Sequence, residues 1–340
     1  MGTSSPHRPQ QEERVAIHTR KLSTLNGMRN YHTLVNELIE RQLLNWDTAR
    51  SNYKALTRAK TRRLVMGQAA IVLQFNPERI RSSAARVDAE SLRARDCFLC
   101  QAHQPAEQEA VEWRGKYKIQ VNPYPIFPRH LTIASLAHTP QSIEGRVGDL
   151  LALADDLQDY VIFYNGPRCG ASAPDHQHFQ AGNRDFLPFC NELWPFDEID
   201  KRDDFVLELC TNKGCNVFLL SATNVASAER VFATLQEARP VRAGEREPMQ
   251  NVLCWKDGEW WRVALFPRMR HRPSNYGEGE GHFLLSPASV DLGGLWAVPV
   301  EKDFNTLTTA DLEKIIAELC MNRDEINQVI NIYNQKSNEI

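Results

Sequence analysis

The segment 170–182 reads Gly-Ala-Ser-Ala-Pro-Asp-His-Gln-His-Phe-Gln-Ala-Gly and carries polar side chains at alternating positions: His176, His178 and Gln180. Successive side chains of an extended strand point to opposite faces, so this spacing predicts a strand with both imidazoles and the amide on one face. The glycine-containing stretch 165–175 is expected to be a loop that leads into the strand. Such a polar row is unfavourable on a buried face unless it takes part in chemistry, so the fold should form a site here.

The residue types in this row suit chemistry at phosphorus. An imidazole can attack a phosphorus atom, and a neighbouring amide can hydrogen-bond a phosphoryl oxygen. One histidine would then form a covalent nucleotidyl-histidine, while loop N–H groups and the Ser172 hydroxyl bind the phosphate. A neutral imidazole fits this task, because its ordinary pKa of about 6.5 leaves it mostly unprotonated at pH 7. The alternative is an exposed polar face of an edge strand, which the flanking loop and Gln180 disfavour.

Composition narrows the class of protein. The chain has 340 residues, of which 42% are hydrophobic, enough for one large or two modest domains with a sizeable core. The net charge of −3 gives no overall basic field for nucleic acid, and no apolar run approaches the length of a membrane span. The first 14 residues lack the apolar stretch of a signal peptide, so we expect a cytoplasmic protein without a nucleic-acid or membrane partner.

Apolar spacing predicts helices and strands that do not alternate regularly. Helices are expected over 31–45, 147–157, 227–238, 312–319 and 326–333, and strands over 65–75, 117–121, 130–134, 160–164, 252–256 and 259–266. The proline-rich stretch 122–128 is expected to be a loop, and Asp257-Gly258 is a strong hairpin signal. The irregular order indicates an α+β fold with antiparallel pairing rather than a doubly wound sheet.

Cys97 and Cys100 are separated by two residues, a spacing that can hold one zinc ion. Two further ligands are needed, and His130 and His176 are candidates at strand-like positions. The metal would tie the N-terminal part of the chain to the histidine strand and orient His176 beside the nucleophile. A redox pair and ordinary core cysteines remain as alternatives, although cysteines of a cytosolic protein are expected to stay reduced.

Two basic segments are candidates for binding the phosphates of a substrate. The segment 266–273 contains Arg268 and His271, and the segment 74–81 contains Arg79. Their cationic side chains could bind phosphate groups or a sugar acid. In both segments the alternative is a loop whose charges face water.

Phe163-Tyr-Asn165-Gly, Gly170-Ala-Ser172 and His176-Gln-His178-Phe-Gln180 resemble the active-site segment of the galactose-1-phosphate uridylyltransferase branch of the histidine-triad superfamily. This branch also contains the diadenosine tetraphosphate phosphorylases and the GDP-hexose phosphorylases. Its mark is His-x-His-x-Gln, where ordinary histidine-triad hydrolases have a third histidine. Cys97-x-x-Cys100 and Pro128-Arg-His130-Leu-Thr132 are similar to the zinc-binding elements of the uridylyltransferases. The resemblance covers about residues 65–190, and the whole chain is most similar to a bacterial group within this branch.

The resemblance implies a histidine-triad-like antiparallel sheet with flanking helices, in two tandem halves of which the second is degenerate. The expected divisions are an N-terminal tail and helical segment over 1–60, a catalytic half over 61–190, a second half with the basic motif over 191–305, and C-terminal helices over 306–340. Homodimers are common among the uridylyltransferases.

The resemblance also implies roles for individual residues. His178 matches the nucleophile and Gln180 matches the amide that hydrogen-bonds the transferred phosphoryl group. Asn165, Gly170 and Ser172 match positions around the phosphates, and Cys97, Cys100, His130 and His176 match the ligands of a structural Zn²⁺.

The chain also departs from the uridylyltransferase pattern, which typically runs Ser-Asn-Pro-His-Pro-His. Asp175 lies between Pro174 and His176, and Gln177 replaces the second proline, so the segment is closer to the phosphorylases. We expect transfer of a nucleoside monophosphate from a dinucleoside polyphosphate or nucleotide sugar to phosphate or a sugar phosphate. The alternatives are a galactose-1-phosphate uridylyltransferase-like enzyme and a nucleotide-binding module without turnover.

Overall fold

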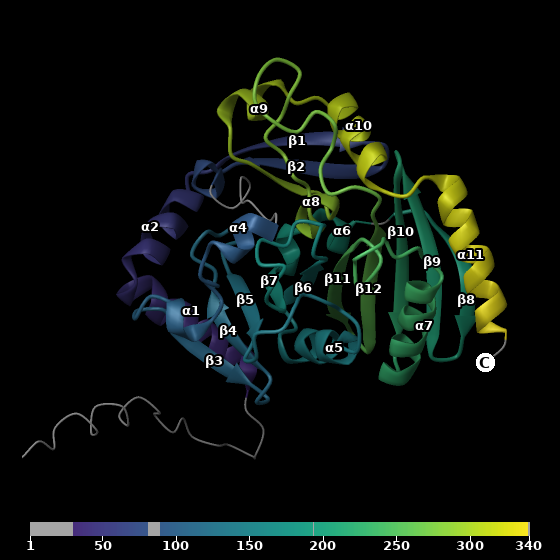
Figure 1. Cartoon of the computed structure of the whole chain (residues 1–340), viewed down its shortest axis with the longest axis horizontal. Helices are drawn as coiled ribbons and strands as arrows, with labels where there is room; N and C mark the ends of the chain where they lie inside the picture. The colour runs from purple at the N-terminus through teal and green to yellow at the C-terminus, as the bar shows by residue number, and fades with distance from the viewer. Residues whose placement is uncertain (1–29, 81–88, 193, 339–340) are drawn as a thin grey trace, which may run out of the picture. The chain divides into compact units, whose positions relative to one another are not determined.

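The computed structural model describes residues 30–80, 89–192 and 194–338, so the expected N-terminal tail lies outside the described residues. Figure 1 shows a large central sheet with helices around it. Ten antiparallel strands form this sheet in the order β3-β4-β5-β7-β6-β11-β12-β10-β9-β8, and three more strands form a small sheet in the order β1-β2-β13. This arrangement confirms the α+β class with antiparallel pairing.

The ten-stranded sheet contains the same unit twice. The first unit consists of β3 (Ala110–Trp113), β4 (Tyr117–Val121), β5 (His130–Ser135), α5 (Val147–Asp156), β6 (Tyr160–Asn165) and β7 (His178–Asn183). The second consists of β8 (Phe196–Arg202), β9 (Phe205–Asn212), β10 (Cys215–Ala222), α7 (Val225–Glu237), β11 (Gln250–Asp257) and β12 (Trp260–Pro267). Each unit is three strands, a helix and two strands, and in each the last strand lies between the third and the fourth.

The two units join through antiparallel pairing of β6 with β11, in which Asn165 lies opposite Asn251. They differ most between their last two strands. In the first unit residues 166–177 connect β6 to β7, whereas in the second unit a two-residue turn after Asp257 connects β11 to β12. The described part of the second unit therefore has no counterpart of the loop before His178, which agrees with a degenerate second half.

Apolar side chains pack on both faces of the large sheet. On β6, Ile162 and Tyr164 belong to the core on one face and Val161 and Phe163 to the core on the other, because alternate residues of a strand point to opposite faces. The first core includes buried residues of α1 (Tyr31–Asn45), α5, α7 and α11 (Arg323–Ser337). The second includes residues of the small sheet and of α8 (Ser289–Leu292), α9 (Glu301–Thr306) and α10 (Thr309–Leu319).

Several expected elements are confirmed with small shifts. The helix over 31–45 matches α1, and the Asp257-Gly258 hairpin joins β11 and β12. The strand expected over 65–75 is instead two strands, β1 (Lys60–Met66) and β2 (Ala69–Phe75), joined by a turn in which Gly67 has a φ of 62°. A left-handed φ of this kind suits glycine because no Cβ opposes it.

Segments that are far apart in the sequence meet in the small sheet. β2 pairs in parallel with β13 (Leu295–Val298), so the start of the expected catalytic half shares a sheet with the end of the second half. The remaining helices are α2 (Asp47–Leu56), α4 (Ala89–Arg93) and α6 (Pro188–Asn191). Among the described residues, none of the helices has the length and apolarity needed to span a membrane.

Candidate active site

A cavity of about 510 Å³ lies at the start of β7. Most of the residues expected to bind substrate or to catalyse line it together: Arg79, Asn165, Gly170, Ser172, His178, Gln180 and His271. The second half contributes His271 and the segment 285–291, and the turn between α1 and α2 contributes Trp46. The structure therefore gathers distant segments of the chain around the histidine strand.

The His178 side chain is buried at the first position of β7 and lines the cavity. Its Nδ1 lies 2.8 Å from the carbonyl oxygen of His176. A carbonyl oxygen only accepts hydrogen bonds, so Nδ1 carries the proton and Nε2 keeps its lone pair. Burial lowers the pKa of His178 to about 4, so the ring is neutral at pH 7. No hydrogen bond among the described residues uses Nε2, which leaves this atom free to attack an electrophile.

The Gln180 amide is oriented by a chain of hydrogen bonds that starts at a backbone N–H. Ile126 donates its N–H to Nδ1 of His130 at 3.2 Å, so the proton of this imidazole must sit on Nε2. That Nε2 lies 3.1 Å from Oε1 of Gln180 and donates to it, and Asn122 Nδ2 donates to the same oxygen at 3.4 Å. With its oxygen engaged twice, Gln180 can present its NH₂ group to the cavity as a donor.

Burial, together with the neighbouring Arg79, lowers the pKa of His130 to about 3. The imidazole of His130 is therefore neutral, as its donor and acceptor roles require.

The amide of Asn165 is oriented in the same way. Its Oδ1 accepts from Nδ2 of Asn251 at 2.8 Å and from the backbone N–H of Ser289 at 3.0 Å. Both donors come from beyond the first half of the sheet, from β11 and α8. Its NH₂ group is thereby available on the cavity side, so Asn165 and Gln180 are two amide donors close to His178.

Arg268 was expected to bind substrate, but the structure places it beneath the site instead. Its guanidinium is buried and does not line the cavity. One terminal nitrogen donates to Oδ1 of Asn251 at 2.6 Å and to the carbonyl of Pro287 at 2.9 Å, and the other donates to backbone carbonyls of residues 270 and 271. Arg268 supports Asn251, which in turn holds Asn165.

Cationic side chains also line the cavity. Arg79 donates to the carbonyl of Tyr124 at 2.6 Å, and burial lowers its pKa to about 10, so it stays charged at pH 7. Burial, with the nearby Arg272, Arg268 and Arg168, lowers the pKa of His271 to about 4, so this ring is neutral. Residues 81–88, which follow Arg79 closely and contain further arginines, lie outside the described residues.

The loop before β7 is held by Arg95 and shaped by glycine. Arg95 donates to the carbonyl of Ser172 at 2.8 Å and forms an ion pair with Asp175 at 3.5 Å. Gly170 has a φ of 95°, and a Cβ at this position would lie 2.5 Å from Cβ of Ala288. Only glycine allows the loop to approach α8 this closely.

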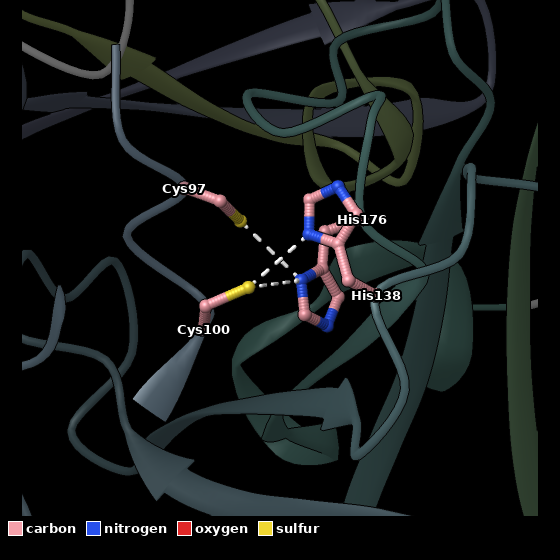
Figure 2. Close-up of side chains that lie close together, drawn as sticks. All are labelled: Cys97, Cys100, His138 and His176. Atoms are coloured by element: carbon pink, nitrogen blue, oxygen red, sulfur yellow. Dashed lines mark hydrogen bonds between the residues drawn. The ribbon is translucent and has the colours of Figure 1, made fainter. Parts of the chain in front are cut away.

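Figure 2 shows Cys97 and Cys100 facing the rings of His138 and His176. Sγ of Cys97 lies 3.3 Å from Nδ1 of His176, and Sγ of Cys100 lies 3.1 Å from Nδ1 of His138. The four ligand atoms lie within 4.8 Å of one another. Two thiols and two imidazoles are a typical donor set for structural zinc.

The tautomer of His176 fits a metal at this cluster. Its Nε2 donates to the carbonyl of Ser135 at 2.9 Å, which leaves Nδ1 as the nitrogen that faces the sulfur atoms. His176 was expected to share a strand face with His178, but β7 begins only at His178 and His176 precedes it. The two imidazoles therefore lie in different places: His176 belongs to the cysteine cluster and His178 lines the cavity.

His130 is expected from the sequence as a metal ligand, but it is not part of the cluster that the structure forms. Both of its ring nitrogens are engaged, by Ile126 and by Gln180, and His138 takes the fourth place in the cluster. A sequence signal for His138 existed, because it is a histidine three residues beyond the end of β5. His130 is the first residue of the same strand. The start of β5 therefore places His130 against Gln180, and the segment after β5 places His138 in the cluster.

Other cavity residues carried no sequence signal. Trp46 lies between α1 and α2, Asn122 lies in the proline-rich loop, and Asp291 lies in α8. Burial raises the pKa of Asp291 to about 6, while its backbone hydrogen bonds and Arg79 act in the opposite direction. These residues reach the cavity only through tertiary packing.

Known proteins match this chain over part of its sequence and over most of its fold. A family described as "Domain of unknown function (DUF4922)" matches residues 38–183, a range that includes the cluster and the first half of the sheet. Galactose-1-phosphate uridylyltransferase of Lactococcus lactis is 37% identical over 70 residues, which cover 20% of this chain and 14% of that protein. Diadenosine 5',5'''-P1,P4-tetraphosphate phosphorylase 2 of Saccharomyces cerevisiae is 29% identical over 117 residues, which cover 30% of this chain and 36% of that protein.

These curated matches span well under two thirds of the relatives' own lengths. The structural match is longer. Yeast Ap4A phosphorylase Apa2 superposes with a TM-score of 0.54 at 17% identity and covers 85% of this chain and 97% of its own, so the two share a fold. Over part of its length the chain is therefore similar in sequence to a galactose-1-phosphate uridylyltransferase and to a diadenosine tetraphosphate phosphorylase, and most of the chain shares the fold of yeast Ap4A phosphorylase.

Proposed function

We propose that this protein is a nucleotidyltransferase of the phosphorylase type that works through a covalent nucleotidyl group on His178. The observation that carries the proposal is the tautomer of His178. Its Nδ1 is held by a backbone carbonyl at 2.8 Å, so its nucleophilic Nε2 is free beside two amide donors in the cavity. A non-catalytic nucleotide module has no need of this arrangement.

The reaction has two balanced steps. Nε2 of His178 attacks the α-phosphorus of a dinucleoside polyphosphate or a nucleotide sugar, a P–N bond forms, and the P–O bond to the leaving phosphate ester breaks. An oxygen of inorganic phosphate or of a sugar phosphate then attacks the same phosphorus, and the P–N electron pair returns to Nε2. The NH₂ groups of Gln180 and Asn165 stabilise the charge on the phosphoryl oxygens in both steps.

The charges around the cavity favour a polyphosphate substrate. The cationic side chains of Arg79, Arg95 and Arg272 all line it, and each can pair with a phosphate oxygen. A nucleotide sugar carries fewer phosphate groups for these side chains. A uridylyltransferase would use the same first step and differ in the acceptor.

Cys97, Cys100, His138 and His176 would hold a structural Zn²⁺. Such an ion cross-links the segments that carry its ligands. Because the carbonyl of His176 holds Nδ1 of His178, fixing residue 176 also fixes the orientation of the nucleophile.

The test is the intact mass of the purified protein after brief exposure to UDP-, GDP- and ADP-sugars and to diadenosine tetraphosphate. The quench is alkaline, because a phosphoramidate on histidine is acid-labile. We expect an added nucleoside monophosphate in the wild type and none in His178→Ala, with the added mass naming the base. Nucleotide binding that is the same in both proteins, without an adduct in the wild type, would support a binding module and contradict the proposal.

A further inference from the structure

The pairing between β6 and β7 stops short of the nucleophile. The last paired residues are Phe163 and Gln180, and continuation of this register would place Asn165 directly opposite His178. The two strands do not pair there. The side chain of Gln141, from the loop between β5 and α5, lies between them instead.

The Gln141 amide takes the place of a peptide group from a neighbouring strand. Its Oε1 accepts the backbone N–H of His178 at 2.8 Å. Its Nε2 donates to the carbonyl of His178 at 3.0 Å and to the carbonyl of Asn165 at 2.9 Å. The side chain is 1% exposed, so these bonds are shielded from water. One amide thus satisfies both backbone polar groups of the nucleophile and also holds β6.

The loop that carries Gln141 is fastened from two directions. Gln177, which lies between the two histidines, donates its N–H to the carbonyl of Thr139 at 2.6 Å and accepts the N–H of Ser142 at its Oε1 at 2.9 Å. Glu247, from the segment before β11, accepts the N–H of Ile143 at 2.8 Å. The loop is therefore tied both to the histidine segment and to the second half of the chain.

We propose that Gln141 is a positioning residue for the nucleophile. Its amide keeps β6 and β7 apart at Asn165 and His178, so that the imidazole leaves the backbone at a fixed angle toward the cavity. Paired strands lie only about 4.7–4.9 Å apart, so direct pairing here would narrow the space beside the ring. This inference rests on the proposed function, because the position of His178 matters for rate only if His178 reacts.

Chemistry restricts which residue can do this. The position needs one acceptor and a donor with two hydrogens, on a side chain long enough to reach between two strands. Leucine is one bond shorter and has no polar atoms, so it would leave a buried N–H and two carbonyls without partners. Glutamate keeps the acceptor but would set a carboxylate against two carbonyl oxygens.

The experiment compares Gln141→Leu with a matched control, Asn212→Leu. Asn212 is also a buried amide that joins two backbone groups, the carbonyl of Met66 at 2.9 Å and the N–H of Gln68 at 3.4 Å, but it does not line the cavity. Three quantities are measured: the single-turnover rate of adduct formation, the Kd of AMP, and hydrogen exchange of the peptide that contains the His178 amide.

We expect Gln141→Leu to slow adduct formation about 10- to 100-fold, the effect of a small misplacement of a reacting group. The Kd of AMP should change by less than about threefold, since binding needs no aligned nucleophile. The His178 amide should exchange faster. Asn212→Leu should lower the Tm without changing the rate of adduct formation or the exchange at His178.

An adduct rate in Gln141→Leu equal to that of Asn212→Leu, or a rate loss matched by an equal loss of AMP affinity, would overturn the proposal. If the wild type forms no adduct, the proposed function fails, and unchanged exchange at His178 in Gln141→Leu would separately refute the positioning role. Should Gln141→Leu fail to fold, Gln141→Glu replaces it in the same measurements, because it keeps the acceptor for the His178 N–H.

Discussion

The orientation of the Gln180 amide depends on His130, and this dependence can be measured. His130→Leu removes the donor at 3.1 Å from Oε1 of Gln180 and leaves only Asn122 at 3.4 Å. Leucine keeps apolar contact with Phe127 and Phe163, whose rings lie near the imidazole. Without the His130 donor the amide can rotate, and its oxygen would then face the phosphoryl oxygens.

The size of the effect follows from two limits. Loss of the whole donor in Gln180→Ala should slow nucleotidyl transfer about 10²- to 10³-fold, the usual effect of removing one oxyanion donor. Loss of one neutral hydrogen bond that biases the amide is worth about 0.5–1.5 kcal/mol, which corresponds to about 2- to 13-fold in rate. The Ile126 N–H also loses its acceptor, so the free energy of unfolding should fall by about 1–3 kcal/mol.

The assay is single-turnover formation of the nucleotidyl-histidine in a double-mutant cycle of His130→Leu and Gln180→Ala. If His130 acts through Gln180, its substitution should have no further effect on rate in the Gln180→Ala background. Stability is measured in parallel by urea unfolding, so that a folding defect is not read as a rate effect. Additive losses in the double mutant would refute the reasoning, because His130 would then act by another route.

Three further results are expected. His138→Ala should lose the stoichiometric zinc that the wild type and His130→Leu retain, as measured by metal analysis of the purified proteins; retention by His138→Ala would contradict the ligand set. Asn251→Ala removes one of the two donors to Asn165 and should lower kcat/KM about 2- to 13-fold, so an unchanged kcat/KM would argue against this support. For Asp291, burial raises the pKa from 3.8 to about 6, so between these pH values the folded state holds a proton that the unfolded state has released. Its contribution to the free energy of unfolding should therefore fall by up to about 3 kcal/mol as pH rises through this window, a slope absent from Asp291→Asn in urea unfolding.

Much of the fold followed from local patterns in the sequence. Helix α1 and the hairpin between β11 and β12 have strong local signals, apolar spacing in one case and Asp257-Gly258 in the other. The order of strands in the sheet could not be read in this way, because it depends on pairings between distant segments. The turn at Gly67 between β1 and β2 was not predicted, because the largely apolar stretch around it looks like one continuous strand.

The candidate site, too, could be predicted from the sequence only in part. His178 and Gln180 are close in sequence, so strand periodicity placed them on one face. The sequence did not decide between His130 and His138 at the cysteine cluster, because His130 begins β5, His138 follows it, and only the packed structure shows which ring meets the cysteines. Gln141 gave no signal at all, because its role arises from a strand pairing that is interrupted.

The pairing of β6 with β11 has a consequence for how this protein is divided. Asn165 on β6 takes hydrogen bonds from Asn251 and Ser289, and the Gln141 loop is tied to Glu247, all from beyond the first half. A fragment ending at residue 183, where the family match ends, would expose β6 as an open edge and lose these donors. The second copy of the unit thus acts as a scaffold for the first, and the smallest piece of this chain that can hold the site is longer than the piece that its relatives share by sequence.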